Sequence, residues 1–259
     1  MSMTYSTIQL NVPEGKKIYF ASDFHLGAPD IKQSKERELR LVRWLQTIRP
    51  HTGALFLVGD LFDFWFEYKY VVPKGFTRFL VEISKFRDLD VPVYVFTGNH
   101  DIWMFDYLQE EIGVEVLRQP TIFDINNERF FIAHGDGLGP GDNKFKFLKR
   151  IFTIPLFQKL FSWIHPDIGI RVAQAWSNHS RTDPKDEKFM GEDEERLLIY
   201  SKEQLKINPA RYYIFGHRHL PLEIDISPDS KYINLGDWLY NYTYLQYDGT
   251  KVELKRYES

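Results

Sequence analysis

The sequence predicts an α/β fold in which two mixed β-sheets pack together between flanking helices (α/β/β/α). In the amino-terminal half, short apolar strands alternate with amphipathic helices, which is typical of parallel strand pairing. In the carboxyl-terminal half, four short alternating segments separated by turn signals indicate a second, largely antiparallel sheet. We expect a single domain over residues 1–259, with a helical cap inserted at about residues 138–208.

Composition narrows the classes of function. The chain has 259 residues, of which 43% are hydrophobic and 16% aromatic, enough for a large core. The absence of cysteine excludes disulfides and thiolate metal sites. A net charge of −3 argues against a nucleic-acid binder, and a nuclease is the least favoured reading. With no signal-peptide pattern and no long apolar run, we expect a cytoplasmic protein.

The first buried strand, Lys17–Ser22, ends directly in Asp23-Phe24-His25. Residues two apart in an extended segment point to the same side, so Asp23 and His25 are expected to meet one ion. A helix over Ile31–Arg49 follows, with its charged face in solvent.

The second strand, Ala54–Val58, runs into Gly59-Asp60-Leu61-Phe62-Asp63. An unpaired Asp60 carboxylate facing Asp23 would be costly, and a bound cation would remove that cost. The aromatic run Phe62–Tyr70 is expected to form a packed wall, and Pro73–Arg87 the next helix.

Three further strands also end in polar groups. Val91–Phe96 leads to Gly98-Asn99-His100-Asp101, Arg129–Ala133 to His134-Gly135-Asp136, and Arg211–Phe215 to Gly216-His217-Arg218-His219. A single buried histidine is usually a core residue. Here, however, five of the eight histidines of the chain lie just beyond apolar strands, as do Asp23, Asp60 and Asn99. This set indicates a site at the carboxyl ends of the strands.

The second sheet is assigned to the end of the chain, and its four segments are Leu222–Ile226, Tyr232–Leu235, Thr243–Tyr247 and Val252–Arg256. Asn234–Trp238 lies between two of them and is expected to be a structural turn, with its role left open.

The segment between the H-G-D block and the Arg211–Phe215 strand is both basic and apolar. Residues 143–181 contain seven Lys or Arg and one acid, Asp167, interleaved with Phe, Trp and Ile. Two interpretations stay open: a helical cap that packs its apolar side on the core, or a surface that contacts lipid.

The ordered blocks D-x-H, G-D-x-x-D, G-N-H-D, H-G-D and G-H-x-H resemble those of the calcineurin-like metallophosphoesterase superfamily, from Asp23 to His219. The resemblance implies two divalent metal ions bridged by Asp60. It implies one ion on Asp23, His25, Asp60 and His219, and a second on Asp60, Asn99, His134 and His217. Oxygen and nitrogen ligands without thiolate suit Mn²⁺, which we favour, with Fe or Zn²⁺ as alternatives.

His100 is not needed as a ligand in this scheme. From its position we expect it to stabilise the transition state or to protonate the leaving oxygen, with Asp101 orienting its ring.

The helical insertion, through K-F-L-K-R-I-F-T-I-P-L-F and on to S-N-H-S, is similar to the cap of the UDP-2,3-diacylglucosamine pyrophosphohydrolases of lipid A synthesis. The resemblance implies an amphiphilic nucleotide-sugar lipid as substrate, its acyl chains in the cap, and peripheral contact with the inner membrane. It implies that the substrate-binding residues are Asn99, His100, Ser180, Lys185 and Lys188.

Two departures from that family concern the substrate. The family typically has arginine at the position of His100, and Phe145 replaces a tyrosine of the cap. Another nucleotide or amphiphilic phosphodiester therefore stays open as the substrate, as does a phosphoprotein phosphatase. A non-catalytic binding module is the alternative outside enzymes, although no expected metal ligand is missing.

Overall fold

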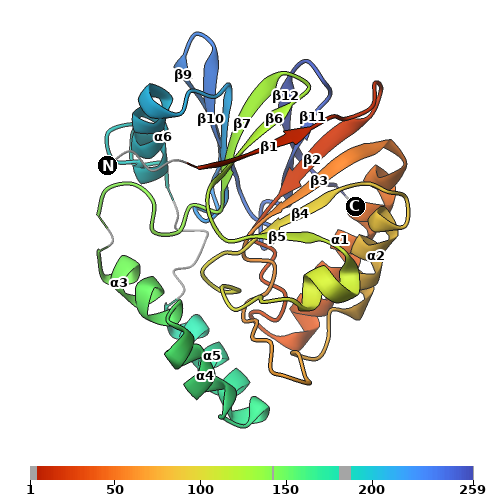
Figure 1. Ribbon diagram of the computed structural model, residues 1–259, viewed down its shortest axis with the longest axis vertical. Coiled ribbons are helices and arrows are strands. Elements are labelled where there is room, and N and C mark those ends of the chain that lie inside the picture. The colour runs from red at the N-terminus through yellow and green to blue at the C-terminus, as the bar shows by residue number, and fades with distance from the viewer. Residues whose placement is uncertain (1–4, 142, 181–187, 259) are drawn as a thin grey trace.

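The computed structural model describes residues 5–141, 143–180 and 188–258. Two six-stranded sheets pack face to face, and helices cover the outer side of each (Figure 1). The helices are α1 (Ile31–Ile48), α2 (Thr77–Arg87), α3 (Asn143–Phe152), α4 (Pro155–Ser162), α5 (Pro166–Ser180) and α6 (Arg196–Ile207), with short turns at Arg49–His51 and Leu108–Ile112. This is the predicted α/β/β/α class.

The first sheet, sheet A, has the strand order β1-β6-β7-β8-β10-β9. Its strands are β1 (Ser6–Leu10), β6 (Thr121–Ile125), β7 (Glu128–Ala133), β8 (Tyr212–Phe215), β9 (Pro221–Ser227) and β10 (Ser230–Leu235). β7, β8 and β10 run parallel to one another, so their carboxyl ends lie at one edge.

The second sheet, sheet B, has the strand order β12-β11-β2-β3-β4-β5. Its strands are β2 (Lys17–Ala21), β3 (Thr52–Val58), β4 (Val93–Phe96), β5 (Glu115–Leu117), β11 (Thr243–Tyr247) and β12 (Val252–Arg256). β2, β3, β4 and β5 are parallel, and β11 pairs antiparallel with β2.

Three apolar layers hold these elements together. Between the sheets, Phe20 stacks on Phe56, and Phe123 of sheet A meets the Phe56 ring edge-on. Outside sheet B lie α1 and α2, and outside sheet A lies α6. Because the central strands are buried on both faces, their sequences are continuously apolar instead of alternating.

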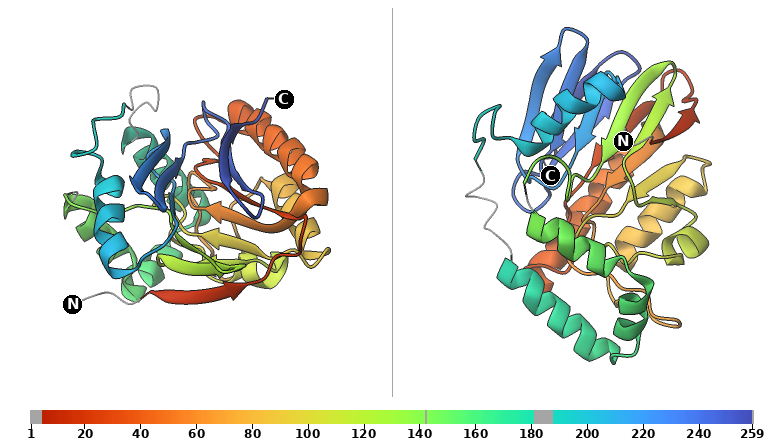
Figure 2. Two further views of the ribbon diagram at one scale, coloured as in Figure 1. Left: turned by 90° about the horizontal axis from the view of Figure 1, so that it is seen from above. Right: turned by 60° about the vertical axis from the view of Figure 1, so that its left-hand side comes forward.

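Helices α3, α4 and α5 form an arm that extends away from the sheets (Figures 1 and 2). The arm packs on the aromatic run that follows β3, residues Phe62–Tyr70. Phe66 is buried as part of the expected wall, and its ring lies 4.8 Å from that of Phe161 in α4. The indole of Trp103 also packs on Phe161, and its Nε1 donates a 2.8 Å hydrogen bond to the carbonyl oxygen of Phe152.

The expected cap, residues 138–208, differs from what the structure shows at its carboxyl end. α6 lies within that range, yet it packs on sheet A through buried Leu197, Leu198 and Tyr200. Only α3–α5 project. The sequence pattern of these helices is similar, so it could not show that the apolar face of α6 packs on sheet A.

The prediction that the four carboxyl-terminal segments form their own sheet is wrong. β9 and β10 extend sheet A beside β8, whereas β11 and β12 extend sheet B beside β2. Segments adjacent in sequence therefore separate into different sheets, because β2 and β8 each offer an edge on which they can pair. Strands β1, β5 and β6 were not predicted.

Candidate metal centre

The seven predicted ligands meet where the two sheets present the carboxyl ends of their parallel strands. Asp23, Asp60 and Asn99 follow β2, β3 and β4 of sheet B, and His134 and His217 follow β7 and β8 of sheet A. Loops from both sheets bond to one another: the amide of His217 donates to Asp23 Oδ2 at 3.0 Å. The site is thus built across the join between the sheets.

One half of the cluster contains Asp23, His25, His219 and one oxygen of Asp60. His219 Nε2 lies 3.3 Å from Asp23 Oδ1 and 3.2 Å from His25 Nε2. His25 Nε2 is also 3.7 Å from Asp60 Oδ2. Asp23, His25 and Asp60 are almost completely buried.

The other half contains His134, Asn99, His217 and the same Asp60 oxygen. His134 Nε2 lies 3.3 Å from Asp60 Oδ2 and 3.3 Å from Asn99 Oδ1. One donor atom each from Asp60, His134 and His217 falls within 4.8 Å of the others. Asp60 therefore stands between the two groups.

Groups behind the histidines direct their Nε2 atoms inward. His134 Nδ1 lies 2.8 Å from the carbonyl oxygen of Val58, which can only accept, so Nδ1 carries the proton. Behind His25, Asp63 Oδ1 is 3.6 Å from Nδ1, and behind His219, Asp237 Oδ2 is 3.4 Å from Nδ1. Outer carboxylates and carbonyls of this kind orient metal-binding imidazoles.

This arrangement fits divalent cations. With Nδ1 protonated, the Nε2 lone pairs of His25 and His219 face each other at 3.2 Å, and that of His134 faces two oxygens. Acceptors repel at such distances unless a cation or a proton lies between them. Burial alone would lower the pKa of His134, but the Asp60 carboxylate outweighs it and raises the pKa to about 10. Burial raises the pKa of Asp23 to about 6.

The backbone at the ligands is left-handed, which differs from the extended geometry expected for D-x-H. Asp23, His25, Asp60, His217 and His219 have φ between 44° and 68°. β2 ends at Ala21, so Asp23 and His25 converge through two left-handed residues and not through strand periodicity. Such conformations are costly for residues with a Cβ and cluster at functional sites.

In three of the motif blocks, the glycine position has no room for a Cβ atom. A Cβ on Gly98 would lie 2.1 Å from Asp60 Oδ1, and one on Gly216 would lie 2.5 Å from Asp23 Oδ2. A Cβ on Gly59, where φ is +83°, would lie 2.4 Å from His134 Nδ1. Each glycine lets a neighbouring loop bring its ligand into the cluster.

Asp101 does not orient the His100 ring, which corrects that expectation. Its carboxylate accepts the amides of Leu61 and Gly98, each at 2.7 Å, and so braces two loops of the site. His100 Nδ1 instead lies 3.0 Å from the carbonyl oxygen of Asp63 and 3.1 Å from Ser177 Oγ. Burial, reinforced by the charge of Asp60, raises the pKa of Asp101 to about 7.

Sequence reasoning therefore missed Asp63, Asp237 and Ser177. Asp63 was visible as the second acid of G-D-x-x-D, and Asp237 lies in the block whose role was left open. Ser177 carried no signal, because its place beside the site depends on how the arm folds back.

The substrate-binding residues predicted in the cap lie next to or within the gap at residues 181–187, which the structure does not describe. Lys185 lies outside the described residues, and of Ser180 only the backbone, the end of α5, is described. Lys188 is exposed, and its carbonyl oxygen accepts a 3.5 Å hydrogen bond from Arg218, in the loop between His217 and His219.

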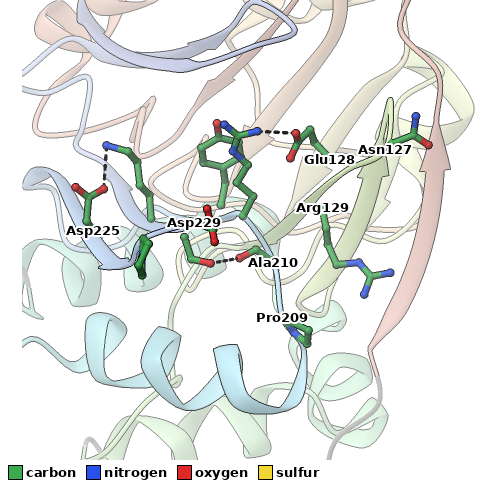
Figure 3. Close-up of a pocket in the computed structure, with 12 residues that line it drawn as sticks. Asn127, Glu128, Arg129, Pro209, Ala210, Asp225 and Asp229 are labelled. Atoms are coloured by element: carbon green, nitrogen blue, oxygen red, sulfur yellow. Dashed lines mark hydrogen bonds and ion pairs between the residues drawn. The ribbon is translucent and has the colours of Figure 1, made fainter.

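A separate depression of about 600 Å³ lies at the opposite end of sheet A (Figure 3). Residues at the amino ends of β7, β8 and β10 line it. Two ion pairs lie within it, Arg211 with Glu128 at 2.5 Å and Lys231 with Asp225 at 3.1 Å. None of the seven predicted metal ligands lines this depression.

A buried cluster of carboxylate, imidazole and amide groups at the joined edges of a two-sheet sandwich is typical of metal-dependent hydrolases. A family model described as calcineurin-like phosphoesterase matches residues 16–221. The chain belongs to this family. It is a hydrolytic enzyme, and the family implies divalent metal ions.

The relatives of this chain include several proteins named UDP-2,3-diacylglucosamine hydrolase. The Porphyromonas gingivalis protein is 35% identical over 256 residues, covering 93% of this chain and 98% of its own length. The Haemophilus ducreyi protein is 25% identical over 223 residues, covering 85% and 91%. The Nitrosococcus oceani protein is 24% identical over 224 residues, covering 85% and 86%.

Replacing Gly98 with alanine is expected to displace Asp60 and to lower bound divalent metal per chain by about half or more. Metal analysis of the purified variant is the measurement. Gly249→Ala is the matched control, because φ there is +97° but the added Cβ meets open space. The control should lose about 1–2 kcal/mol of stability from backbone strain and keep its metal. Equal metal loss in both variants would contradict the steric explanation.

Mn²⁺ binding near pH 7.5 is expected to release about one proton per chain, because His134 must lose the proton that its raised pKa retains. Metal affinity should therefore rise with pH until His134 is deprotonated in the free protein. Calorimetric titration in buffers of different ionisation enthalpy measures the release. Binding heats that do not depend on the buffer would count against this protonation state.

Proposed function

We propose that the protein hydrolyses the pyrophosphate bond of UDP-2,3-diacylglucosamine to UMP and 2,3-diacylglucosamine 1-phosphate (lipid X). The Porphyromonas gingivalis relative carries the proposal, since the alignment covers 98% of that protein and includes the region of the arm. We further propose Asp23, His25, Asp60, Asn99, His134, His217 and His219 as ligands of two divalent cations, with Asp60 shared.

The cations would lower the pKa of a shared water, hold a phosphoryl oxygen and neutralise the charge that develops during in-line displacement. In the overall reaction, a water oxygen bonds to the α-phosphorus and the bond from this phosphorus to the bridging oxygen breaks. His100 is proposed to act on the phosphate groups. Its Nδ1 faces the Asp63 carbonyl oxygen, so Nε2 remains to stabilise the transition state or, when protonated, to donate to the leaving oxygen.

Manganese is the proposed metal. The donor set consists of carboxylate, imidazole and amide groups, and the whole sequence lacks cysteine. Hard oxygen donors combined with imidazole suit Mn²⁺, with Fe or Zn²⁺ as alternatives.

The arm is proposed to hold the acyl chains and to contact the inner membrane peripherally. Its described surface exposes a set of large apolar side chains: Phe147, Leu156, Phe157, Leu160, Trp163, Ile164, Ile168 and Val172. Exposed Arg150, Lys159 and Arg171 accompany them, a combination that favours an anionic lipid surface. No helix in the described parts of the chain has the length and hydropathy for a bilayer crossing.

Another amphiphilic phosphodiester is the second candidate substrate, and His100 is the observation that favours it. The UDP-2,3-diacylglucosamine pyrophosphohydrolases, which the sequence resembles, typically have arginine at this position. An imidazole offers one hydrogen-bonding nitrogen to a phosphate, whereas a guanidinium offers a planar fork of donors.

UMP release from UDP-2,3-diacylglucosamine by the Mn²⁺-loaded protein tests the proposed reaction, with Asp60→Ala as the blank. We expect rapid release by the unchanged protein and loss of activity in the variant, because both cations lose a shared ligand. His100→Ala should lower turnover by about a hundredfold or more while bound metal is unchanged.

If the protein cleaves an aryl phosphodiester but releases no UMP, the substrate assignment fails and the dimetal mechanism stands. Full turnover by His100→Ala would remove the proposed role of that residue.

Sedimentation with vesicles tests the proposed membrane contact. Wild-type protein should bind vesicles containing phosphatidylglycerol, and Leu156→Glu/Trp163→Glu should bind about tenfold or more weakly, because it loses apolar area and gains negative charge. Leu89→Glu is the matched control, since Leu89 is similarly exposed but lies after α2 on the body. Equal binding by all three proteins would exclude the arm as the contact.

A further inference from the structure

The last helix of the arm places a hydroxyl against the proposed catalytic histidine. Ser177 in α5 is only 7% exposed although most of the arm faces solvent. Its Oγ lies 2.9 Å from Asp63 Oδ1 and 3.1 Å from His100 Nδ1. This contact joins residues more than 70 positions apart in the sequence.

The donors and acceptors around His100 Nδ1 fix one arrangement. A carboxylate only accepts, so the Ser177 hydroxyl donates to Asp63 Oδ1. Its oxygen then presents a lone pair to Nδ1. The Asp63 carbonyl oxygen, 3.0 Å from Nδ1, also accepts. Both groups require the proton on Nδ1, which leaves Nε2 at the other end of the ring.

Asp63 also connects this contact to the metal centre. Its Oδ1 is 3.7 Å from His100 Nδ1 and 3.6 Å from His25 Nδ1, and the rings of His25 and His100 lie edge to face with centroids 4.8 Å apart. A change in the direction of the Ser177 hydroxyl therefore bears on a carboxylate that both histidines share.

Several further contacts attach the arm to the body, so the position of α5 does not depend on Ser177 alone. Lys149 of α3 forms a 2.6 Å ion pair with buried Asp136 of the H-G-D block. The Trp103 indole donates a hydrogen bond to the end of α3, and Phe161 of α4 packs on Phe66. Ser177 adds a contact on the His100 side of the metal centre, whereas Lys149 lies on the His134 side.

We propose that Ser177 is a positioning residue, contributed by the arm, that holds the His100 ring in the orientation needed for turnover. The arm then acts in the chemical step as well as in binding the substrate. The inference rests on the proposed function. It concerns the His100 of this chain, whose protonated Nδ1 donates to the Ser177 oxygen.

Steady-state kinetics of Ser177→Ala on UDP-2,3-diacylglucosamine tests the proposal. We expect kcat to fall about ten- to a hundredfold with KM changed less than about twofold. Ser177→Thr keeps the hydroxyl and should recover most of the activity. Ser162→Ala, in α4 of the same arm, is the matched control and should behave as wild type, because its hydroxyl bonds only the carbonyl oxygen of Lys159.

A double variant separates action through His100 from a general structural effect. In the His100→Ala background, Ser177→Ala should cause little further loss, because the group that it positions is gone. A full additional loss would overturn the proposal. An increase in KM with unchanged kcat would also overturn it, since Ser177 would then only bind substrate.

Imidazole ¹⁵N spectra of the metal-free protein provide a readout that does not depend on turnover. The His100 signals, assigned by their absence in His100→Gln, should show the Nδ1–H tautomer in wild type and a shifted Nδ1 signal in Ser177→Ala, because this nitrogen then loses one of its two acceptors. Identical spectra would overturn the proposal. If wild type releases no UMP, the proposed substrate fails, whereas these spectra still decide whether Ser177 positions His100.

Discussion

The structure depends on one electrostatic constraint: several hydrogen-bond acceptors are buried together with their lone pairs directed at one another. Asp60 has an oxygen within 3.7 Å of His25 Nε2 and 3.3 Å of His134 Nε2, and it is 1% exposed. Water cannot solvate this carboxylate, and burying its charge without a counter-charge would cost on the order of several kcal/mol. Cations between the acceptors would convert the repulsion into attraction. Metal binding would then also stabilise the fold.

The surrounding architecture keeps the acceptors from turning away. Left-handed backbone at five ligands aims their side chains inward, and Gly59, Gly98 and Gly216 allow loops from different strands to approach. Behind the imidazoles, Asp63, Asp237 and the Val58 carbonyl fix which nitrogen faces the centre. Because these supports come from both sheets, the packed core between the sheets sets the spacing of the ligands.

The strand-glycine-donor pattern identified the residues that the structure brings together, because each donor immediately follows a buried strand. The pattern could not show how the donors converge, since D-x-H uses two left-handed residues in place of an extended strand. It also misassigned the carboxyl-terminal segments, whose sheet depends on distant edges at β2 and β8. Asp237 and Ser177 reach the site through tertiary contacts, which no local sequence periodicity encodes. Asp101 was visible as a buried acid, but its partners are main-chain amides of two other loops.

In the proposed function, the arm and the metal centre form one functional unit because an amphiphilic substrate has two ends with opposite needs. Its phosphate groups would meet the cations and His100, whereas its acyl chains would need apolar surface, which α3–α5 expose. Such a substrate needs a boundary where apolar helix meets polar site, and Ser177 lies at that boundary, buried yet bonded to Asp63. A helix that only enclosed lipid would not need a hydroxyl there. A soluble phosphodiester would gain nothing from the apolar arm, so the pairing of the two features favours a lipid-linked pyrophosphate.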